Sequence, residues 1–196
     1  MHDLGRNEDR LRGTYEFPFE FHHIDSTHPR YVMSYHWHVE CEIMRVLQGT
    51  LTVTLDEKSF TAKAGDVIFV NSGVLHSGIP QDCIYQCIVF DMNMFLKFNS
   101  VCTEYMQKIS HQELLIYHHF TEKQPDIQRA ANSLFDSFWQ RKPGYELVVF
   151  GQFYHFFGLV FGNHYYLESL RKTRRDYKRI VQLKQVVEFI EKNYAN

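Results

Sequence analysis

The sequence of 196 residues has few cysteines, no excess of charge of one sign and no long run of purely apolar residues. Its cysteines, Cys41, Cys83, Cys87 and Cys102, have neither the density of a disulfide scaffold nor the paired spacing of a zinc ribbon. A formal net charge of −2 argues against a general surface for binding polyanions. The charged residues between Arg6 and Arg12 are unlike a signal peptide, so we expect a cytoplasmic protein with reduced thiols.

One segment, residues 147–167, contains no Asp, Glu, Lys or Arg. Polar residues interrupt it, and Gly151, Gly158 and Gly162 lower its helix propensity. Because a spanning helix needs about twenty predominantly apolar residues, we expect a helix buried in the protein or at a subunit interface, and no contact with a membrane.

Residues 14–92 have the pattern of short strands. Residues 51–55 alternate between apolar and polar, turns follow at 56–58 and 64–66, and apolar runs occupy 67–70 and 85–90. Strands this short, with turns about every ten residues, indicate an antiparallel sandwich or barrel. The sequence therefore predicts a mainly β domain over residues 1–98.

Residues 99–168 have a different, helical pattern and contain many of the 17 Phe residues. An apolar stripe with spacings of four, three and four predicts a helix that begins near Pro125 and ends before residues 143–144; the stripe is Ile127, Ala131, Leu134 and Phe138. A second helix would complete an antiparallel hairpin. Phe150, Phe153, Phe157 and Phe161 exceed what one facing helix would cover, so we expect residues 125–167 to form a homodimer.

The last part of the chain reads as a basic linker, residues 169–178, followed by one amphipathic helix, residues 179–196. The basic run from Arg171 to Arg179 is better explained as a solvated linker than as a surface that contacts phosphates. A lone amphipathic helix cannot bury its own apolar face. We therefore expect residues 179–196 to begin a further domain that the chain does not complete.

Two polar clusters lie about thirty residues apart in the β region, and both carry metal-binding residue types. The first contains His36, His38 and Glu42, and the second leads to His76. Side chains two residues apart on a strand point to the same face, so these four groups could converge in one pocket. Imidazole and carboxylate suit divalent transition metals such as Zn, Ni, Fe or Mn. A hydrogen-bonding pocket without metal is the alternative, and the spacing alone does not exclude it.

Strand alternation also predicts the surroundings of this cluster. Met44 and Val46 share the parity of Glu42 and should form pocket walls, whereas Trp37 should turn away into the packing face. Arg45 should face outward at the surface. Glu40 is expected on a loop, without a ligand role. The histidine pairs 22–23 and 118–119 are expected to be ordinary surface or interface residues, and Cys83 and Cys87 are expected to be packed thiols.

The spacing of the two clusters resembles the cupin motifs. The first motif fits through His36, His38, Glu42 and Gly49, and the second fits through Gly65, Gly73 and His76. Asn71 stands where cupins usually have Pro, and Pro80 stands where the closing Asn is expected. The resemblance implies a jelly-roll barrel, the double-stranded β-helix, and that fold hosts many chemistries.

The rest of the chain resembles the AraC-type transcriptional regulators, in which a cupin domain is followed by a helical hairpin, a linker and a double helix-turn-helix domain. The helix ending at Asn193 and Tyr194 matches the end of the first helix of that DNA-binding domain. The resemblance implies a small-molecule effector, most plausibly a carbohydrate or related polyol, held by polar groups including His36, His38, Glu42 and His76. DNA would be bound only through recognition helices beyond residue 196.

Two other functions fit part of the sequence. A metal-dependent cupin enzyme, such as a dioxygenase or isomerase, would explain the four candidate ligands but not the linker and the final helix. A pure dimerisation module with a vestigial barrel would explain the helices but not the polar cluster. Ligand sensing without catalysis explains most of the sequence.

Overall fold

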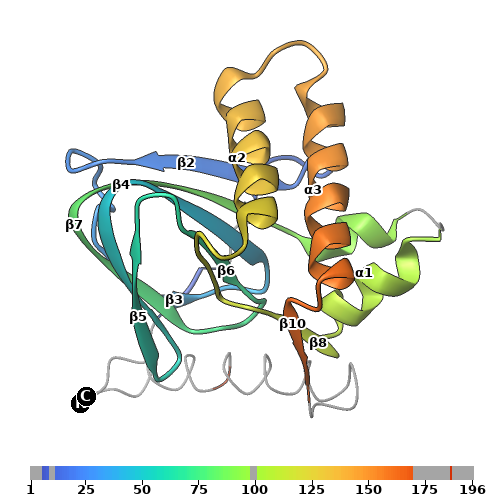
Figure 1. The fold of residues 1–196 in the computed structure, drawn as a ribbon, viewed down its shortest axis with the longest axis horizontal. Coiled ribbons are helices and arrows are strands. Elements are labelled where there is room, and N and C mark those ends of the chain that lie inside the picture. The colour runs from blue at the N-terminus through green and yellow to red at the C-terminus, as the bar shows by residue number, and fades with distance from the viewer. Residues whose placement is uncertain (1–5, 9–11, 98–100, 170–185, 187–196) are drawn as a thin grey trace.

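The computed structural model describes residues 6–8, 12–97, 101–169 and 186. A strongly curved, mainly antiparallel sheet forms most of the structure, and a helical hairpin crosses one of its faces (Figure 1). The strands are β1 (Arg6–Asn7), β2 (Phe19–Ile24), β3 (Met33–Trp37), β4 (Cys41–Leu55), β5 (Lys58–Lys63), β6 (Val67–Val70), β7 (His76–Phe90), β8 (Leu114–Ile116), β9 (His119–Phe120) and β10 (Tyr166–Glu168). The helices are the 3₁₀ helix η1 (Met92–Leu96), α1 (Thr103–Ser110), α2 (Pro125–Gln140) and α3 (Tyr145–Gly162).

The main sheet is built around two long strands, β4 and β7, which pair from Cys41 opposite Phe90 to Leu55 opposite His76. The strand order is β1-β3-β7-β4-β6-β9, with β2 also paired to β7 and β5 also paired to β4. The predicted strands at 51–55, 67–70 and 85–90 are all present as parts of β4, β6 and β7. The prediction of a mainly β domain with helices is therefore confirmed.

Alternate residues of the same strands supply two separate apolar cores. Ile43, Phe69 and Phe90 pack toward the helices, whereas Met44 and Tyr85 belong to a second cluster on the opposite face of the sheet. This follows from the two-residue period of a strand, because successive side chains point to opposite faces. The β domain therefore has a helix-covered outer face and an inner face on its concave side.

Two glycines of the sequence motifs lie where the backbone needs a positive φ. Gly49 has a φ of 67° beside a register shift of β4 against β7, and a Cβ there would overlap the backbone of Asp82. Gly73 has a φ of 73°, and its N–H donates to the carbonyl of His38 at 2.8 Å. This hydrogen bond, from Gly73 to His38, joins the two polar clusters of the sequence directly.

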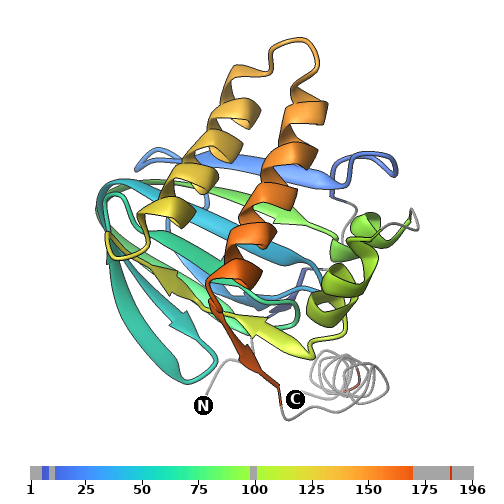
Figure 2. The ribbon, with the colours of Figure 1, turned by 45° about the vertical axis from the view of Figure 1, so that its right-hand side comes forward.

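The helical hairpin forms where the sequence predicts it. Pro125 occupies the first turn of α2, and Arg141 and Gly144, both with positive φ, make the connection to α3. The predicted stripe of α2 is buried in the outer core, and both helices lie across the outer face of the sheet (Figure 2).

The covering of the hairpin aromatics differs from the prediction. Phe153 and Phe157 have no exposed surface and belong to the core of their own chain. Phe150 and Phe161 are partly buried against that core. These four rings are therefore largely covered within their own chain, Phe153 by Phe19 and Phe90 of the sheet and Phe161 by Tyr105 of α1 and Tyr166 of β10, so they do not support the predicted homodimer, which stays a prediction.

Three short strands lie in the region that the sequence indicated as helical. Strand β9 extends the main sheet by pairing with β6, while β8 and β10 form a separate two-stranded sheet. Their partners lie far away in sequence, so no local pattern marks them. The uncharged segment 147–167 is consequently divided between α3 and β10.

No helix among the described residues is long and apolar enough to cross a membrane. The predicted linker at 169–178 and helix at 179–196 fall almost entirely outside the described residues.

Candidate metal and ligand site

The structure brings His36, His38, Glu42 and His76 together at one end of the long strands. His36 is on β3, His38 follows the end of that strand, Glu42 is near the start of β4, and His76 is the first residue of β7. His36 is paired with His76 across β3 and β7. One ligand atom from each residue lies within 4.8 Å of the corresponding atoms of the other three. Such an arrangement has the size of a metal-binding site.

Each histidine of this cluster has its Nδ1 fixed by a backbone carbonyl two residues away. The distances are 2.9 Å from His36 to Ser34 O, 3.1 Å from His38 to Glu40 O and 2.8 Å from His76 to Val74 O. A carbonyl oxygen only accepts, so each Nδ1 must carry the proton. In the neutral imidazoles, Nε2 therefore presents a lone pair, as required of a metal ligand.

The atoms at the centre of the cluster lack a satisfactory set of hydrogen bonds. Nε2 of His38 and His76 lie 3.4 and 3.2 Å from Oε2 of Glu42. His76 Nε2 is fully buried and forms no hydrogen bond of acceptable geometry with any described residue. Neutral imidazole lone pairs facing a carboxylate repel one another unless a cation or a proton lies between them. The donor set therefore fits a divalent transition metal.

The charge states of two members agree with this interpretation. Burial opposes the ionisation of Glu42, but hydrogen bonds from His38 and His76 and the positive charge of these imidazoles, when a proton lies between them and the carboxylate, hold the pKa of Glu42 well below its usual value. Burial, together with the nearby His76, lowers the pKa of His36. An ionised carboxylate beside a neutral imidazole is the state in which both bind a metal.

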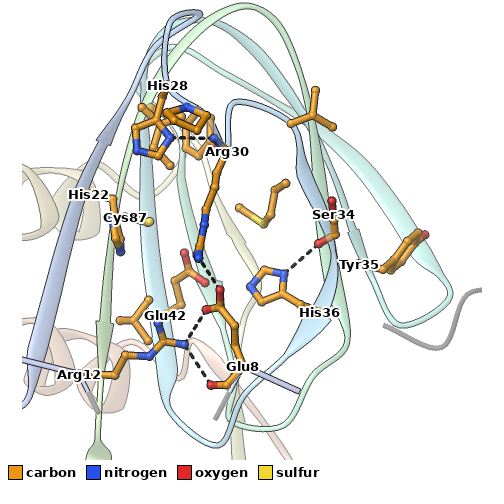
Figure 3. A pocket seen from close by; sticks show the side chains of 16 residues that line it. Glu8, Arg12, His22, His28, Arg30, Ser34, Tyr35, His36, Glu42 and Cys87 are labelled. Carbon is orange, nitrogen blue, oxygen red and sulfur yellow. Dashed lines mark hydrogen bonds and ion pairs between the residues drawn. The ribbon is translucent and has the colours of Figure 1, made fainter. Parts of the chain in front are cut away.

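A cavity of about 390 Å³ adjoins this cluster on the concave side of the sheet. Its walls come from β2, β3, β4 and β7, the loop between β2 and β3, and the segment that carries Glu8 and Arg12 (Figure 3). His36 and Glu42 contribute to both the cavity wall and the four-residue cluster, whereas His38 and His76 lie behind them. A molecule in the cavity would therefore lie next to a bound metal.

Three charged residues meet in this cavity, Glu8 and Arg12 from one segment and Arg30 from the loop between β2 and β3, and no motif of the sequence marks them. Glu8 accepts hydrogen bonds from Arg12 Nη2 at 2.7 Å and from Arg30 Nη1 at 2.6 Å (Figure 3). Burial raises the pKa of Glu8, but the hydrogen bond from Arg12 and the charges of Arg12, His36 and Arg30 lower it to about 2. Arg12 also donates to Glu20 at 2.8 Å. Glu8 is therefore an ionised carboxylate that bridges two guanidinium groups.

The residues predicted to surround the cluster lie on the faces that strand alternation gives them, but the predicted pocket walls need a correction. Met44 and Val46 lie in the inner core but are not part of the cavity wall. Trp37 is 3% exposed, as expected for a packing residue, and Glu40 lies on the connection between β3 and β4.

The predicted surface position of Arg45 is wrong, because the outer face of β4 is covered by α2 and not by solvent. Arg45 is 8% exposed and donates hydrogen bonds to Gln86, Asn132 and Asp136. Its guanidinium also lies 5.0 Å from the centre of the Phe135 ring.

Several side chains expected to have no specific role have defined partners. His22 lines the cavity and lies 3.2 Å from Glu20. His23 contacts Gln86 at 2.9 Å, and His119 contacts Asp66 at 2.8 Å. Cys83 and Cys87 are buried, as expected of packed thiols, and burial raises the pKa of both.

Comparison with known proteins identifies the family. The family model described as the AraC-like ligand binding domain matches residues 18–156, which is most of the chain. The chain belongs to the AraC-like ligand-binding domains. The matched residues of this AraC-like domain include the four-residue cluster and α2, whereas Glu8 and Arg12 precede them.

Individual relatives cover shorter parts of the AraC-like domain. It is 34% identical over 56 residues to YdeC of Bacillus subtilis, an uncharacterized HTH-type transcriptional regulator, and spans 19% of that protein's length. An oxalate decarboxylase of B. subtilis aligns with 31% of the chain and 18% of its own length, at 25% identity and a TM-score of 0.28. A Streptococcus pyogenes protein of unknown function aligns with 37% of the chain and 62% of its own length, at 15% identity and a TM-score of 0.32. Similarities this limited do not extend the assignment beyond the family.

Proposed function

We propose that the chain is the ligand-sensing and dimerisation part of a cytoplasmic AraC-type transcriptional regulator. Its sheet would close as a cupin-type barrel around the effector, and DNA would be bound by a helix-turn-helix domain that follows. The family membership supports a regulator, and the cavity beside the four-residue cluster supports a small-molecule effector. The effector acts only if it binds one arrangement of the domains better than another.

The effector would be a small polar molecule, with a carbohydrate or polyol as the first expectation. Hydroxyl groups can accept from and donate to the polar residues of the cluster, His36, His38, Glu42 and His76, with Met44 behind them in the inner core. The cavity volume of about 390 Å³ lies in the range of small-molecule sites.

The cluster would hold a divalent transition metal, such as Zn, Ni, Fe or Mn. The observation that carries this proposal is that each of the three imidazoles donates from Nδ1 to a carbonyl, while one ligand atom from each lies within 4.8 Å of a Glu42 oxygen and of the others. When bound, the metal would act as a Lewis acid that holds an oxygen of the effector. The residues of the chain would orient that effector and exclude water from it.

The same cluster favours one alternative, a metal-dependent cupin enzyme such as a dioxygenase or isomerase. Three imidazoles and one carboxylate leave positions on a metal to which a substrate could bind. The two functions differ in what happens to the bound molecule. A sensor releases its ligand unchanged, whereas an enzyme converts it, and NMR of the ligand after incubation with metal-loaded protein distinguishes the two.

Metal analysis of protein purified without chelator or metal-affinity resin tests the site. We expect a stoichiometric metal in the wild-type chain. We expect His76→Ala to lower the affinity by at least about 100-fold, because even the loss of groups that only orient metal ligands costs about 10–100-fold. His155→Ala is the matched control, since His155 is exposed on α3. Wild-type protein that takes up no metal when supplied with it would contradict the metal site and leave a metal-free effector pocket.

A homodimer would form through the exposed face of α3. Leu147 is 79% exposed and Val148 is 47% exposed, and Tyr154 continues the same face. Gly151 and Gly158 lie on it too, and a Cβ added at either would contact nothing. An exposed helix face that is apolar and nearly free of charge is characteristic of a protein–protein interface.

A further inference from the structure

The two arginines that hold Glu8 form an anion site inside the cavity. Oxygen Oε2 of Glu8 accepts from Arg12 and Oε1 accepts from Arg30, so one carboxylate spans both guanidinium groups. Hydrogen bonds between ionised partners are shorter and stronger than neutral ones. The cavity therefore already binds one carboxylate, supplied by the chain itself.

Arg12 needs a negatively charged partner at this position. Its side chain is only 2% exposed, and it forms ion pairs with Glu8 and Glu20. Removing one partner of a buried charge leaves that charge poorly compensated. Any molecule that displaces Glu8 must therefore bring a negative charge of its own.

Glu8 is connected to the sheet through β1. Strand β1 pairs with β3 over only two residue pairs, and the N–H of Glu8 adds one hydrogen bond to the carbonyl of Trp37 at 3.0 Å. Arg30 lies on the loop between β2 and β3, with a side chain that is 59% exposed. A ligand carboxylate that replaced Glu8 would keep the charge on the arginines balanced.

The remainder of the cavity offers groups suited to hydroxyls. Ser34, His36 and His22 also line the cavity, and His36 Nδ1 donates to the Ser34 carbonyl (Figure 3). We infer that the effector is a small hydroxylated carboxylic acid, whose carboxylate takes the place of Glu8 between Arg12 and Arg30. This inference rests on the proposed role of the cavity as an effector site, and it replaces a neutral sugar by an acidic one.

Matched pairs of acids and neutral polyols test the charge requirement. The probes are D-glucuronate with D-glucose, and D-gluconate with D-glucitol, each titrated calorimetrically against the full 196-residue chain. The chain is first treated with chelator, so that no carboxylate can bind to a metal instead. We expect at least one acid to bind at least about tenfold more tightly than its neutral partner, since hydrogen bonds between ionised partners are roughly twice as strong as neutral ones.

Two variants test the position of the carboxylate. Arg30→Gln should weaken binding of the acid by about tenfold or more, because it removes one charged donor. Glu8→Gln should tighten binding, because it removes the competing carboxylate. Arg129→Gln and Glu57→Gln are controls, since both residues are exposed and lie outside the cavity wall. If Glu8→Gln does not fold, Arg30→Gln decides the question alone, because its side chain is largely in solvent.

The outcomes separate this inference from the proposed function. Equal binding of an acid and its neutral partner, no binding of any acid at millimolar concentration, or insensitivity to Arg30→Gln would each overturn the inference. Binding of neutral sugars alone would also overturn the inference, but it would be compatible with the proposed sensor function. Inorganic phosphate that bound as tightly as the acids, with the same dependence on Arg30, would overturn the carboxylate in favour of an unselective anion site. Acid binding that follows the expected pattern but is accompanied by turnover would support the inference and refute the sensor.

Discussion

Arg12 depends on the carboxylates around it, because its charge lies in a side chain almost entirely removed from water. The carboxylates of Glu8 and Glu20 both accept hydrogen bonds from Arg12 and balance its positive charge. Transferring an unpaired guanidinium from water to such a place would cost several kcal/mol. The stability of the cavity wall is therefore linked to the ionisation of Glu8, one of these two carboxylates.

This linkage predicts a specific response to acid. The pKa of Glu8 is about 2 in the folded protein and 4.5 when unperturbed, so its contribution is complete above pH 4.5 and is lost as the pH falls toward 2. Glu8→Gln should remove that part of the acid sensitivity. We expect the wild-type chain to lose about 1–2 kcal/mol more than the variant between these pH values, allowing for solvent screening of the partly exposed carboxylate.

Urea unfolding at a series of pH values measures the difference, with Glu57→Gln as the control at an exposed position. Parallel pH profiles for the wild type and Glu8→Gln would contradict the linkage.

At the scale of elements, α2 is held to the sheet by a polar contact as well as by its apolar stripe. Arg45 reaches from β4 to Gln86 on β7 and to Asn132 and Asp136 on α2. Along β7, Tyr85 and Cys87 line the cavity while Gln86 points the other way. The helix is thus attached to the reverse side of the cavity wall, one residue from the side chains that would contact a ligand.

Replacing Arg45 should destabilise this attachment. Arg45→Met keeps much of the apolar length but leaves the buried Gln86 oxygen without its donor, and such a loss costs about 1–3 kcal/mol. Asp136→Ala should cost less than about 1 kcal/mol, because the Asp136 side chain is 54% exposed.

Chemical denaturation of both variants gives the two free energies of unfolding. A larger cost for Asp136→Ala than for Arg45→Met would show that the surface ion pair, and not the buried amide, fixes the helix.

At the scale of the whole molecule, the proposed homodimer would depend on the exposed face of α3. Leu147→Glu places a charge in the most exposed part of the proposed interface, where two copies would meet. Like charges brought together at an interface cost several kcal/mol, so we expect the dimer to weaken by at least about tenfold. Sedimentation equilibrium measures this, with Ile79→Glu as a control at another exposed apolar residue. A wild-type chain that remained monomeric at high micromolar concentration would refute the dimer.

The parts of the molecule that could be predicted from sequence are those that depend on local period and fixed spacing. The alternation of β4 and β7, the stripe of α2 and the convergence of His36, His38, Glu42 and His76 are all of this kind. Alternation gave the correct face for Arg45 but not the helix that covers it. Glu8 and Arg12 are four residues apart, but no local pattern relates them to Arg30, so only the folded structure reveals that the three meet.

The bridging carboxylate of Glu8 also has a consequence for the concentration at which the domain would respond. An acid can bind only to those molecules in which Glu8 has moved away from the two arginines. The apparent dissociation constant is therefore the intrinsic dissociation constant divided by the fraction of such molecules. A residue outside the family-matched segment therefore sets the threshold of the dose–response curve. Substitutions near β1 could retune that threshold over orders of magnitude while every ligand-contacting atom of the cavity stays unchanged.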